Sequence, residues 1–162
     1  VYPGCDITVA KSSPLNIRFQ LSSTNFLHMS PETTIEDQIW AEDLDDNERT
    51  VVDGLHDWLA RNERARWKQS KHGIELCQEQ ELYDLASPIL PKDAKNAIFR
   101  TNSTWQLKES GKLIPIYASE GCSITYKSTK YSLEYGKKLH LPTQVTLEVA
   151  EQCMLYLLWI VQ

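Results

Sequence analysis

The segment from residue 61 to residue 72 mixes basic and aromatic side chains, which are the residue types that contact nucleic acids. It reads RNERARWKQSKH. Its basic side chains include Arg61, Arg64, Arg66 and Lys68. Arginine can bind phosphate through paired hydrogen bonds, and a ring such as that of Trp67 can stack on a base. The segment therefore predicts a nucleic-acid contact, and a solvated helix end is the alternative interpretation.

A second group of residues has side chains that can hold a divalent cation. Asp93 is followed by Gln106, Leu107 and Lys108 on a predicted strand, and this order resembles the PD-(D/E)xK nuclease pattern. In that family an acid pair holds Mg²⁺ and the lysine orients the attacking water. Glu75 would supply a further acid. Gln106 stands where the family usually has a carboxylate, so an exposed hairpin with no metal is the alternative.

An acidic cluster lies before the second predicted helix. It consists of Glu42, Asp43, Asp45, Asp46 and Glu48. Such a cluster could bind a metal ion or a basic protein surface, but DLDDNE lacks the glycine and the spaced terminal glutamate of a calcium loop. We interpret the cluster as a solvated acidic turn that caps a helix, with a basic partner as the alternative.

The chain contains five tryptophans and seven tyrosines, more than a core of this size requires. Tryptophan and tyrosine are enriched where proteins contact one another. Trp58 and Trp159 are expected in the core. Trp67 and Trp105 stand beside charged residues in the sequence, so we predict that both anchor a protein partner.

Other catalytic and metal-binding motifs are absent from the sequence. It contains no GxSxG elbow, no GxxxxGK[S/T] phosphate loop, no GxGxxG turn, no HExxH and no EF-hand run. The four histidines, His28, His56, His72 and His140, are scattered. His72 and Cys77 are the closest approach to metal-ligand spacing, and a zinc site would need two further ligands. We expect no metal site and no cofactor.

The four cysteines are Cys5, Cys77, Cys122 and Cys153, and they form no CxxC pair. This spacing favours buried free thiols and hence an intracellular protein, nuclear or cytoplasmic. Two disulfides of undetermined connectivity are the alternative. Asn102-Ser103-Thr104 satisfies the N-x-S/T rule for N-glycosylation, which has meaning only for a chain that enters a secretory pathway.

Charge is segregated along the chain. The 17 basic and 22 acidic side chains give a net charge of −5. Residues 1–57 carry 3 basic and 11 acidic groups, whereas residues 58–72 carry 5 basic groups and 1 acidic group. An acidic protein gains no general attraction to phosphate. Blocks of opposite charge instead predict partners that recognise one face.

The first half of the chain is predicted to contain strands followed by helices. Residues 15–22, LNIRFQLS, alternate apolar and polar side chains as in a strand with one buried face, and a shorter strand at 7–10 is expected to pair with it. Ser30-Pro31-Glu32 has the residue types of a helix start, so a helix is predicted to about Leu44. Further helices are predicted at 47–68 and at about 75–86.

The second half is predicted to be mainly β. Short segments rich in β-branched and aromatic residues follow one another between residues 97 and 135, separated by turns, and predict a meander of four or five strands. Residues 144–162 fit either a strand or a buried helix, and we predict a helix because the stretch is apolar on nearly all sides. Its longest uncharged part, 153–161, is shorter than the ~20 residues of a membrane span.

Together these segments predict a single α+β domain over residues 1–162. An N-terminal strand pair and the meander would form an antiparallel sheet, with two or three helices inserted at about 30–86 and a terminal helix packed on the sheet. The β-rich half would span about 96–141. Because the chain begins with Val1, we expect it to be a fragment of a longer protein.

The predicted function is a non-catalytic protein-interaction domain within a larger intracellular complex. One contact surface would use Arg61, Arg64, Arg66, Trp67, Lys68 and Trp105. The 153–161 stretch would pack in the core or against a second copy of the chain. The first alternative is a nucleic-acid-binding or nuclease domain that uses residues 61–72, and the second is an extracellular recognition domain with disulfides.

Overall fold

A computed structural model describes residues 38–70, 73–118 and 122–162. The helices in this part of the chain are α1 (Asp46–Arg61), α2 (Gln80–Ala86) and the short 3₁₀ turn η2 (Ser87–Ile89). The strands are β1 (Trp40–Asp43), β2 (Trp67–Gln69), β3 (Glu75–Cys77), β4 (Asn96–Thr101), β5 (Trp105–Leu107), β6 (Gly111–Ala118), β7 (Ser123–Tyr126), β8 (Thr129–Ser132), β9 (Lys137–Leu141), β10 (Val145–Val149) and β11 (Leu155–Val161).

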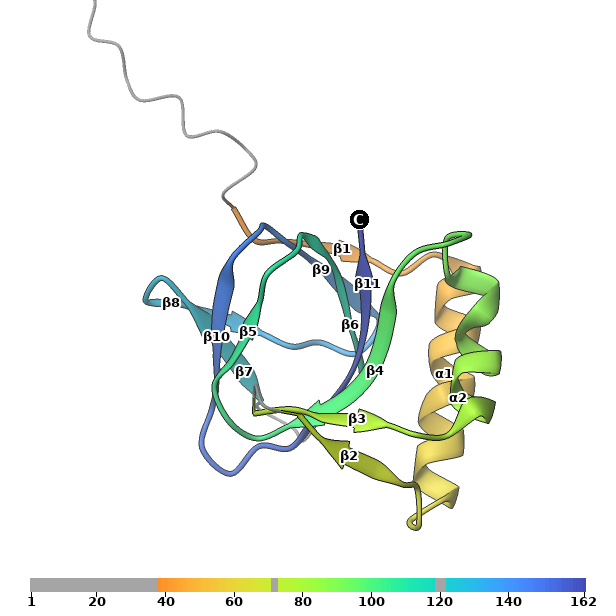
Figure 1. Ribbon diagram of the computed structural model, residues 1–162. Coiled ribbons are helices and arrows are strands. Elements are labelled where there is room, and N and C mark those ends of the chain that lie inside the picture. Colours follow the sequence, from red (N-terminus) through yellow and green to blue (C-terminus); the bar gives the residue numbers. More distant parts are fainter. Residues whose placement is uncertain (1–37, 71–72, 119–121) are drawn as a thin grey trace, which may run out of the picture. The chain divides into compact units, whose positions relative to one another are not determined.

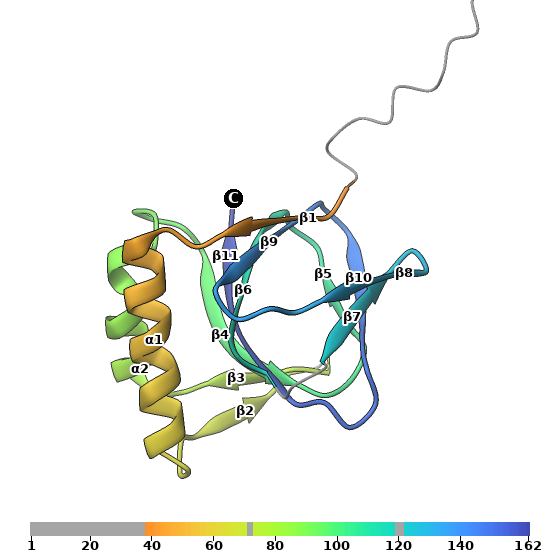
Figure 2. The same ribbon diagram turned by 180° about the vertical axis from the view of Figure 1, so that it is seen from behind.

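The strands form two antiparallel sheets (Figure 1). The larger sheet has seven strands in the order β1-β9-β6-β11-β4-β3-β2, and the smaller has the order β5-β10-β7-β8. The sheets curve around a shared interior, and α1 and α2 lie together on the outer side of the larger sheet (Figure 2). The described residues are therefore mostly β, and the prediction of one sheet with a terminal helix is wrong.

The interior between the sheets is filled by alternate side chains of both. Its largest fully buried members include Phe99, Trp105, Leu113, Ile124, Leu147, Leu155 and Leu157. A second apolar layer lies between the larger sheet and the helices, and includes Val52, Leu55, Leu82, Ile98, Ile114 and Leu158.

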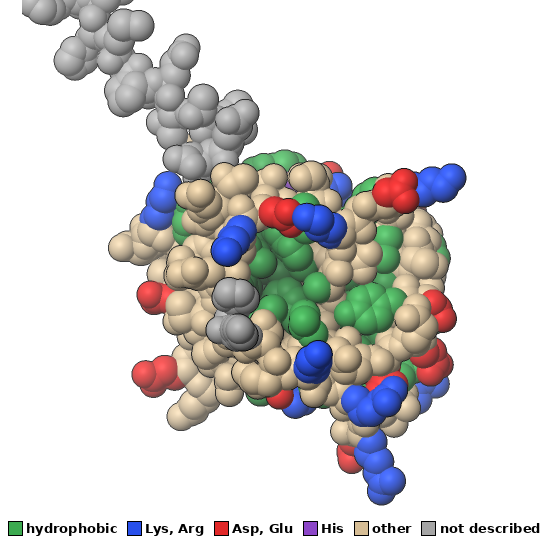
Figure 3. Space-filling model, in the orientation of Figure 1, with side chains coloured by type: hydrophobic (Ala, Val, Ile, Leu, Met, Phe, Trp, Pro, Cys, Tyr) green, Lys and Arg blue, Asp and Glu red, His purple; other side chains and the backbone are tan. Residues whose placement is uncertain are grey.

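Figure 3 shows hydrophobic side chains in a hollow on the face seen there, with charged side chains around its rim.

Strand β11 explains why the C-terminal stretch is apolar at nearly every position. Leu157 and Trp159 face the interior between the sheets, whereas Leu158 and Ile160 face the helices. A strand buried on both faces loses the polar alternation by which strands are usually recognised. The predicted terminal helix is therefore replaced by β10 and β11. The 153–161 stretch packs in the core, one of the two positions we expected for it.

Helix α1 begins where the acidic turn predicts it and ends earlier than expected. Asp45 caps it, with Glu48 completing a reciprocal capping box. The predicted helix at 47–68 stops at Arg61, because the apolar periodicity ends at Leu59 and residues 60–66 offer no further apolar face to bury. None of the helices in the described residues is long and apolar enough to cross a membrane.

Two of the helices predicted in the first half of the chain differ in the structure, and other predicted elements there lie outside the described residues. Residues 40–43 form β1, so the helix predicted from Ser30 does not reach Leu44. The helix predicted at 75–86 is the strand β3 followed by α2, which begins at Gln80. The strands predicted at 7–10 and 15–22 and the start of the first helix lie outside the described residues.

The five β segments predicted between 97 and 135 are strands, but they do not form a meander. β11 lies between β4 and β6, and β5 pairs with β10. β7 and β8 follow one another in the sequence and do pair, as a hairpin. Its two turn residues, Lys127 and Ser128, both have positive φ, which is typical of a two-residue type I′ turn. Alternation predicts which face a strand buries, but it does not predict its neighbour.

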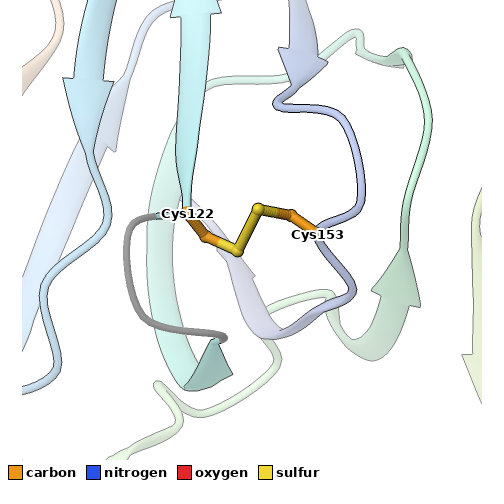
Figure 4. The surroundings of a disulfide bond; sticks show 2 residues. All are labelled: Cys122 and Cys153. Atoms are coloured by element: carbon orange, nitrogen blue, oxygen red, sulfur yellow. A yellow bond between two sulfur atoms is a disulfide. The ribbon is translucent and has the colours of Figure 1, made fainter.

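A disulfide joins Cys122, just before β7, to Cys153, just before β11 (Figure 4), with a Cα–Cα distance of 5.8 Å. It therefore links a strand of the smaller sheet to the central strand of the larger one. The expectation of free thiols is wrong for this pair. Cys77 is a buried free thiol, and burial raises its pKa. Cys5 lies outside the described residues.

Candidate functional site

A groove of about 430 Å³ opens beside the C-terminal end of α1. It is lined by Leu59, Ala60, Asn62, Glu63, Ala65, Trp67, Arg100, Tyr117 and Tyr156. We call it the aromatic groove. Its wall comes from the turn that follows the helix, and its floor comes from the larger sheet.

The floor of the aromatic groove contains a row of residues in register across four strands. Glu75 on β3 lies opposite Arg100 on β4, Arg100 lies opposite Tyr156 on β11, and Tyr156 lies opposite Tyr117 on β6. Residues directly opposite one another in antiparallel strands share one face of the sheet. Farther along β11, Leu158 on the same face packs in the layer beneath the helices. The row is therefore a polar and aromatic continuation of that layer.

A β-bulge gives Tyr117 its place in this row. The pairing of β6 with β11 shifts after Tyr156, so that Tyr156 pairs with Tyr117 but Leu157 pairs with Pro115. The extra residue is Ile116, which is fully buried in the helix-side layer. Regular alternation would turn Tyr117 to the opposite face from Ile116. The bulge brings both to the helix side and leaves Tyr117 45% exposed.

Five aromatic rings form a continuous path that starts in the groove and crosses to α1. Trp67 is 5.6 Å from Tyr156, Tyr156 is 5.8 Å from Tyr117, Tyr117 is 5.3 Å from His56, and His56 is 5.6 Å from Tyr135, measured between ring centroids. Tyr135 is 52% exposed, and its hydroxyl donates to Asp53 Oδ1 at 2.6 Å. Burial and this carboxylate raise the pKa of Tyr135. The path therefore links the rings of the groove to the ring of His56 on α1 and to the exposed ring of Tyr135.

Arg100 is held in the groove by an acid and by a ring. Its Nε donates to Glu75 Oε2 at 2.5 Å, and its guanidinium carbon lies 4.9 Å from the centroid of the Trp67 ring. The hydrogen bond that Arg100 donates to Glu75 is the main reason why the pKa of Arg100 is raised. Glu75 neutralises the charge, and Arg100 also forms a side-chain hydrogen bond with Tyr156. The remaining guanidinium N–H groups of Arg100 keep their capacity to donate hydrogen bonds. Arg100 therefore acts as an oriented donor, with its charge already balanced.

The basic residues predicted to contact a partner lie around the turn that walls the groove. Arg66 is ion-paired with Glu79, Nε to Oε1 at 2.9 Å, and this carboxylate raises its pKa. Arg61 Nε donates to the carbonyl of Asp57. Arg64 and Lys68 are exposed and form no ion pair with the described residues. A second hollow, of about 520 Å³, lies against the same turn and includes Arg61 and Arg64 in its lining.

Trp105 lies elsewhere. It is 1% exposed in the interior between the sheets, with its ring 5.6 Å from that of Phe99. The prediction that Trp105 anchors a partner at the surface is therefore wrong. The sequence places it beside polar residues because β5 alternates: its neighbour Gln106 is exposed and Trp105 points inward.

The residues of the nuclease pattern do not assemble into a metal site. Gln106 and Lys108 line one shallow hollow. Glu75 is bound to Arg100 in the other sheet, and Asp93 is exposed in the loop between η2 and β4 and is not part of that hollow. Within the described residues, no group of three histidine, cysteine or acidic side chains is placed to hold a metal ion.

The acidic cluster makes contacts within the domain. Asp45 Oδ1 accepts from the backbone N–H of Glu48, and Asp46 lies in the first turn of α1. Glu48 binds the buried Lys138 Nζ at 2.7 Å. Glu42 lies 2.9 Å from His140 Nε2, and this hydrogen bond lowers the pKa of Glu42. Asp43 lies opposite Lys137 in the β1–β9 pair.

One end of the aromatic path can be predicted from the sequence, because Trp67 has charged neighbours. Tyr156 lies within the apolar stretch 153–161, and nothing in the sequence marks the bulge that places Tyr117. The available signal was the tyrosine hydroxyl within an otherwise apolar run, since a tyrosine there needs a polar or exposed place for its hydroxyl.

Comparison of the chain with models of protein families, with curated proteins and with solved structures finds no match.

Proposed function

We propose that this domain is a non-catalytic protein-recognition module whose aromatic groove holds an extended, proline-containing segment of another protein. The observation that carries the proposal is the aromatic path, in which exposed and half-buried rings from β2, β11, β6, α1 and the segment before β9 meet in one surface. Large aromatic rings dominate the energetics of protein contacts when they cluster.

The groove is organised before any partner binds. Its rings lie in edge-to-face contact, and Arg100 is fixed between Glu75 and Trp67. Rigid side chains lose little conformational entropy on binding, so more of the contact energy appears as affinity. The polar members of the row are thus already oriented for a ligand.

The chemistry of the lining favours an extended segment with proline. Polyproline II segments form no internal hydrogen bonds, so their carbonyl groups need donors from the partner, while their rings pack between aromatic side chains. The aromatic groove supplies such donors from the guanidinium of Arg100 and from the hydroxyls of Tyr117 and Tyr156. Trp67 supplies further ring area for an apolar side chain.

The charges beside the groove favour acidic residues next to the prolines. Arg64 precedes Ala65, a lining residue, and has no ion-pair partner among the described residues. Lys68 follows Trp67 on β2 and therefore faces the other side of the sheet. Opposite charge in the partner would speed association and fix its direction in the groove. Arg66 contributes less because Glu79 already neutralises it.

The proposed compartment is an oxidising one, the secretory pathway or the cell exterior. The prediction of an intracellular protein depends on free thiols, and Cys122 and Cys153 form a disulfide instead. Disulfides persist mainly in oxidising environments. This supports the extracellular alternative that the sequence left open.

The experiment is a selection of random peptides on the immobilised full chain. We expect selected sequences to share proline with neighbouring acidic residues, and we expect Tyr117→Ala to reduce recovery strongly. Leu85→Ala is the matched control, because Leu85 is an exposed hydrophobic residue on α2 that does not line the groove. Selected peptides without proline, or equal recovery on Tyr117→Ala, would contradict the proposal.

Nucleic-acid binding is the competing function, supported by the basic side chains at 61–68. Two contacts weaken this reading: Glu79 neutralises Arg66, and Arg100 covers one face of the Trp67 ring. Titration with single-stranded oligonucleotides distinguishes the two functions. Affinity that falls steeply with salt and is lost in an Arg64→Glu variant would favour nucleic acid.

A further inference from the structure

The sequence Asn102-Ser103-Thr104 lies on an exposed bend between β4 and β5, and all three residues are exposed. The chain contains six asparagines, and Asn102 is the one followed by the N-x-S/T pattern. An acceptor asparagine must reach the transferring enzyme and must carry a bulky hydrophilic group afterwards, so it belongs on the surface. The bend meets this requirement.

The bend is held in place by the neighbours of Asn102. Thr101 Oγ1 and Ser103 Oγ both donate to the carbonyl of Gly73, at 2.9 and 3.0 Å. Within the described residues the Asn102 side chain makes no hydrogen bond and no ion pair. A substituent on its amide nitrogen would therefore disturb none of the contacts that fix the bend.

The disulfide is a second, independent observation that points to the same chemistry. Thr101 lies opposite Leu155, two residues after Cys153. The sequon and the disulfide thus share one end of the larger sheet. The compartment in which disulfides form in eukaryotic cells, the lumen of the endoplasmic reticulum, is also the one in which N-linked glycans are attached.

We infer that Asn102 is an N-glycosylation site. The co-reactant is a lipid-diphosphate-linked oligosaccharide. The Asn102 Nδ2 forms a bond to the anomeric carbon of its first sugar, the bond between that carbon and the phosphate oxygen breaks, the amide loses one proton and the lipid diphosphate leaves. The inference does not depend on what the aromatic groove binds.

The test is mass spectrometry of the full-length protein expressed from its complete coding sequence in eukaryotic cells. Trypsin cuts after Arg100 and Lys108, so the peptide from Thr101 to Lys108 carries the sequon alone. We expect this peptide to carry a glycan, and we expect peptide N-glycosidase to release it and convert Asn102 to aspartate. An unmodified peptide in protein that contains the Cys122–Cys153 disulfide would overturn the inference.

A matched pair of variants excludes an effect of folding. Thr104→Ser keeps the acceptor pattern and Thr104→Ala destroys it, while both change the same exposed side chain. We expect the glycan to persist in Thr104→Ser and to be lost completely in Thr104→Ala and in Asn102→Gln. Persistence of the modification in Thr104→Ala and Asn102→Gln would place it at another residue and contradict the assignment.

Discussion

At the scale of single residues, the orientation of Arg100 depends on Glu75. The two side chains are 28% and 29% exposed, so the pair is partly shielded from water and its hydrogen bond is worth more than that of a surface pair. Arg100 in turn covers one face of Trp67. The pair therefore stabilises the fold and shapes the groove.

Glu75→Gln should lower the free energy of unfolding by about 1 kcal/mol, because it removes the charge but keeps the shape of the side chain. Urea denaturation measures the change. The matched control is Glu109→Gln, which removes the partner of Lys95 from a pair whose side chains are 48% and 75% exposed. We expect less than about 0.5 kcal/mol there, and equal losses at the two sites would contradict the shielding argument.

The pKa of the buried Lys138 depends on its ion pair with Glu48. Its side chain is 7% exposed and binds Glu48, the residue that also closes the capping box of α1. Burial alone would lower the pKa of Lys138, but the hydrogen bond and charge of Glu48 raise it above the ordinary value. The pair ties strand β9 to the start of the helix.

Lys138→Met should lower the free energy of unfolding by about 3 kcal/mol at neutral pH, because Glu48 would lose its buried partner. The contribution of the lysine is fully present below pH 10.5, the ordinary pKa, and is lost as the pH rises through the raised pKa of the folded state. Urea denaturation of both proteins should therefore show a difference that narrows above pH 10.5. A difference that widens there would contradict the sign of the pKa shift.

At the scale of elements, β10 and β11 differ in how they bury their side chains. In β10 Leu147 is buried and Thr146 is exposed, whereas in β11 the consecutive residues Leu157 and Leu158 are both fully buried. The first strand has one face in solvent, and the second lies between two apolar layers. Position in the sheet therefore determines tolerance to substitution.

Leu157→Ala and Leu158→Ala should each lower the free energy of unfolding by about 3 kcal/mol, because each leaves a cavity in a different layer. In β10, Leu147→Ala should cost a similar amount, and Thr146→Ala should cost less than about 0.5 kcal/mol. Thermal or urea unfolding of the four variants measures this. A loss of less than about 0.5 kcal/mol in the free energy of unfolding at either Leu157 or Leu158 would contradict burial of β11 on both faces.

The sequence predicts where several helices and strands lie better than it predicts which strands pair with one another. The capping residues Asp45 and Glu48 predict the start of α1, and segments rich in β-branched and aromatic residues between turns predict the strands between 96 and 132. The pairing of β11 between β4 and β6 joins segments far apart in the chain, and no local pattern encodes it. The aromatic groove depends on that pairing and on the Ile116 bulge, which explains why only its Trp67 end was predicted.

At the scale of the whole domain, the disulfide connects the two sheets. Cys122 and Cys153 are separated by 31 residues. In the chain-entropy description, a cross-link of this span lowers the conformational entropy of the unfolded chain and so raises the free energy of unfolding by about 4 kcal/mol. Both cysteines are buried in the interior layer. The disulfide therefore cross-links the segment just before β11. This segment lies at the same end of the larger sheet as Asn102.

Cys122→Ser combined with Cys153→Ser should lower the free energy of unfolding by about 2 to 4 kcal/mol. A reducing agent should lower the stability of the natural chain by a similar amount and leave the double variant unchanged. Urea denaturation with and without the reducing agent measures both. Equal sensitivity to reduction in the two proteins would contradict the pairing of Cys122 with Cys153.

The proposed role of the domain as a recognition module is tested most directly by the dissociation constant of one selected proline-containing peptide. Calorimetry would compare the natural chain with Tyr117→Ala and with the control Leu85→Ala. We predict that affinity falls at least about tenfold in Tyr117→Ala and stays unchanged in Leu85→Ala. Equal affinity for all three proteins would contradict binding in the aromatic groove.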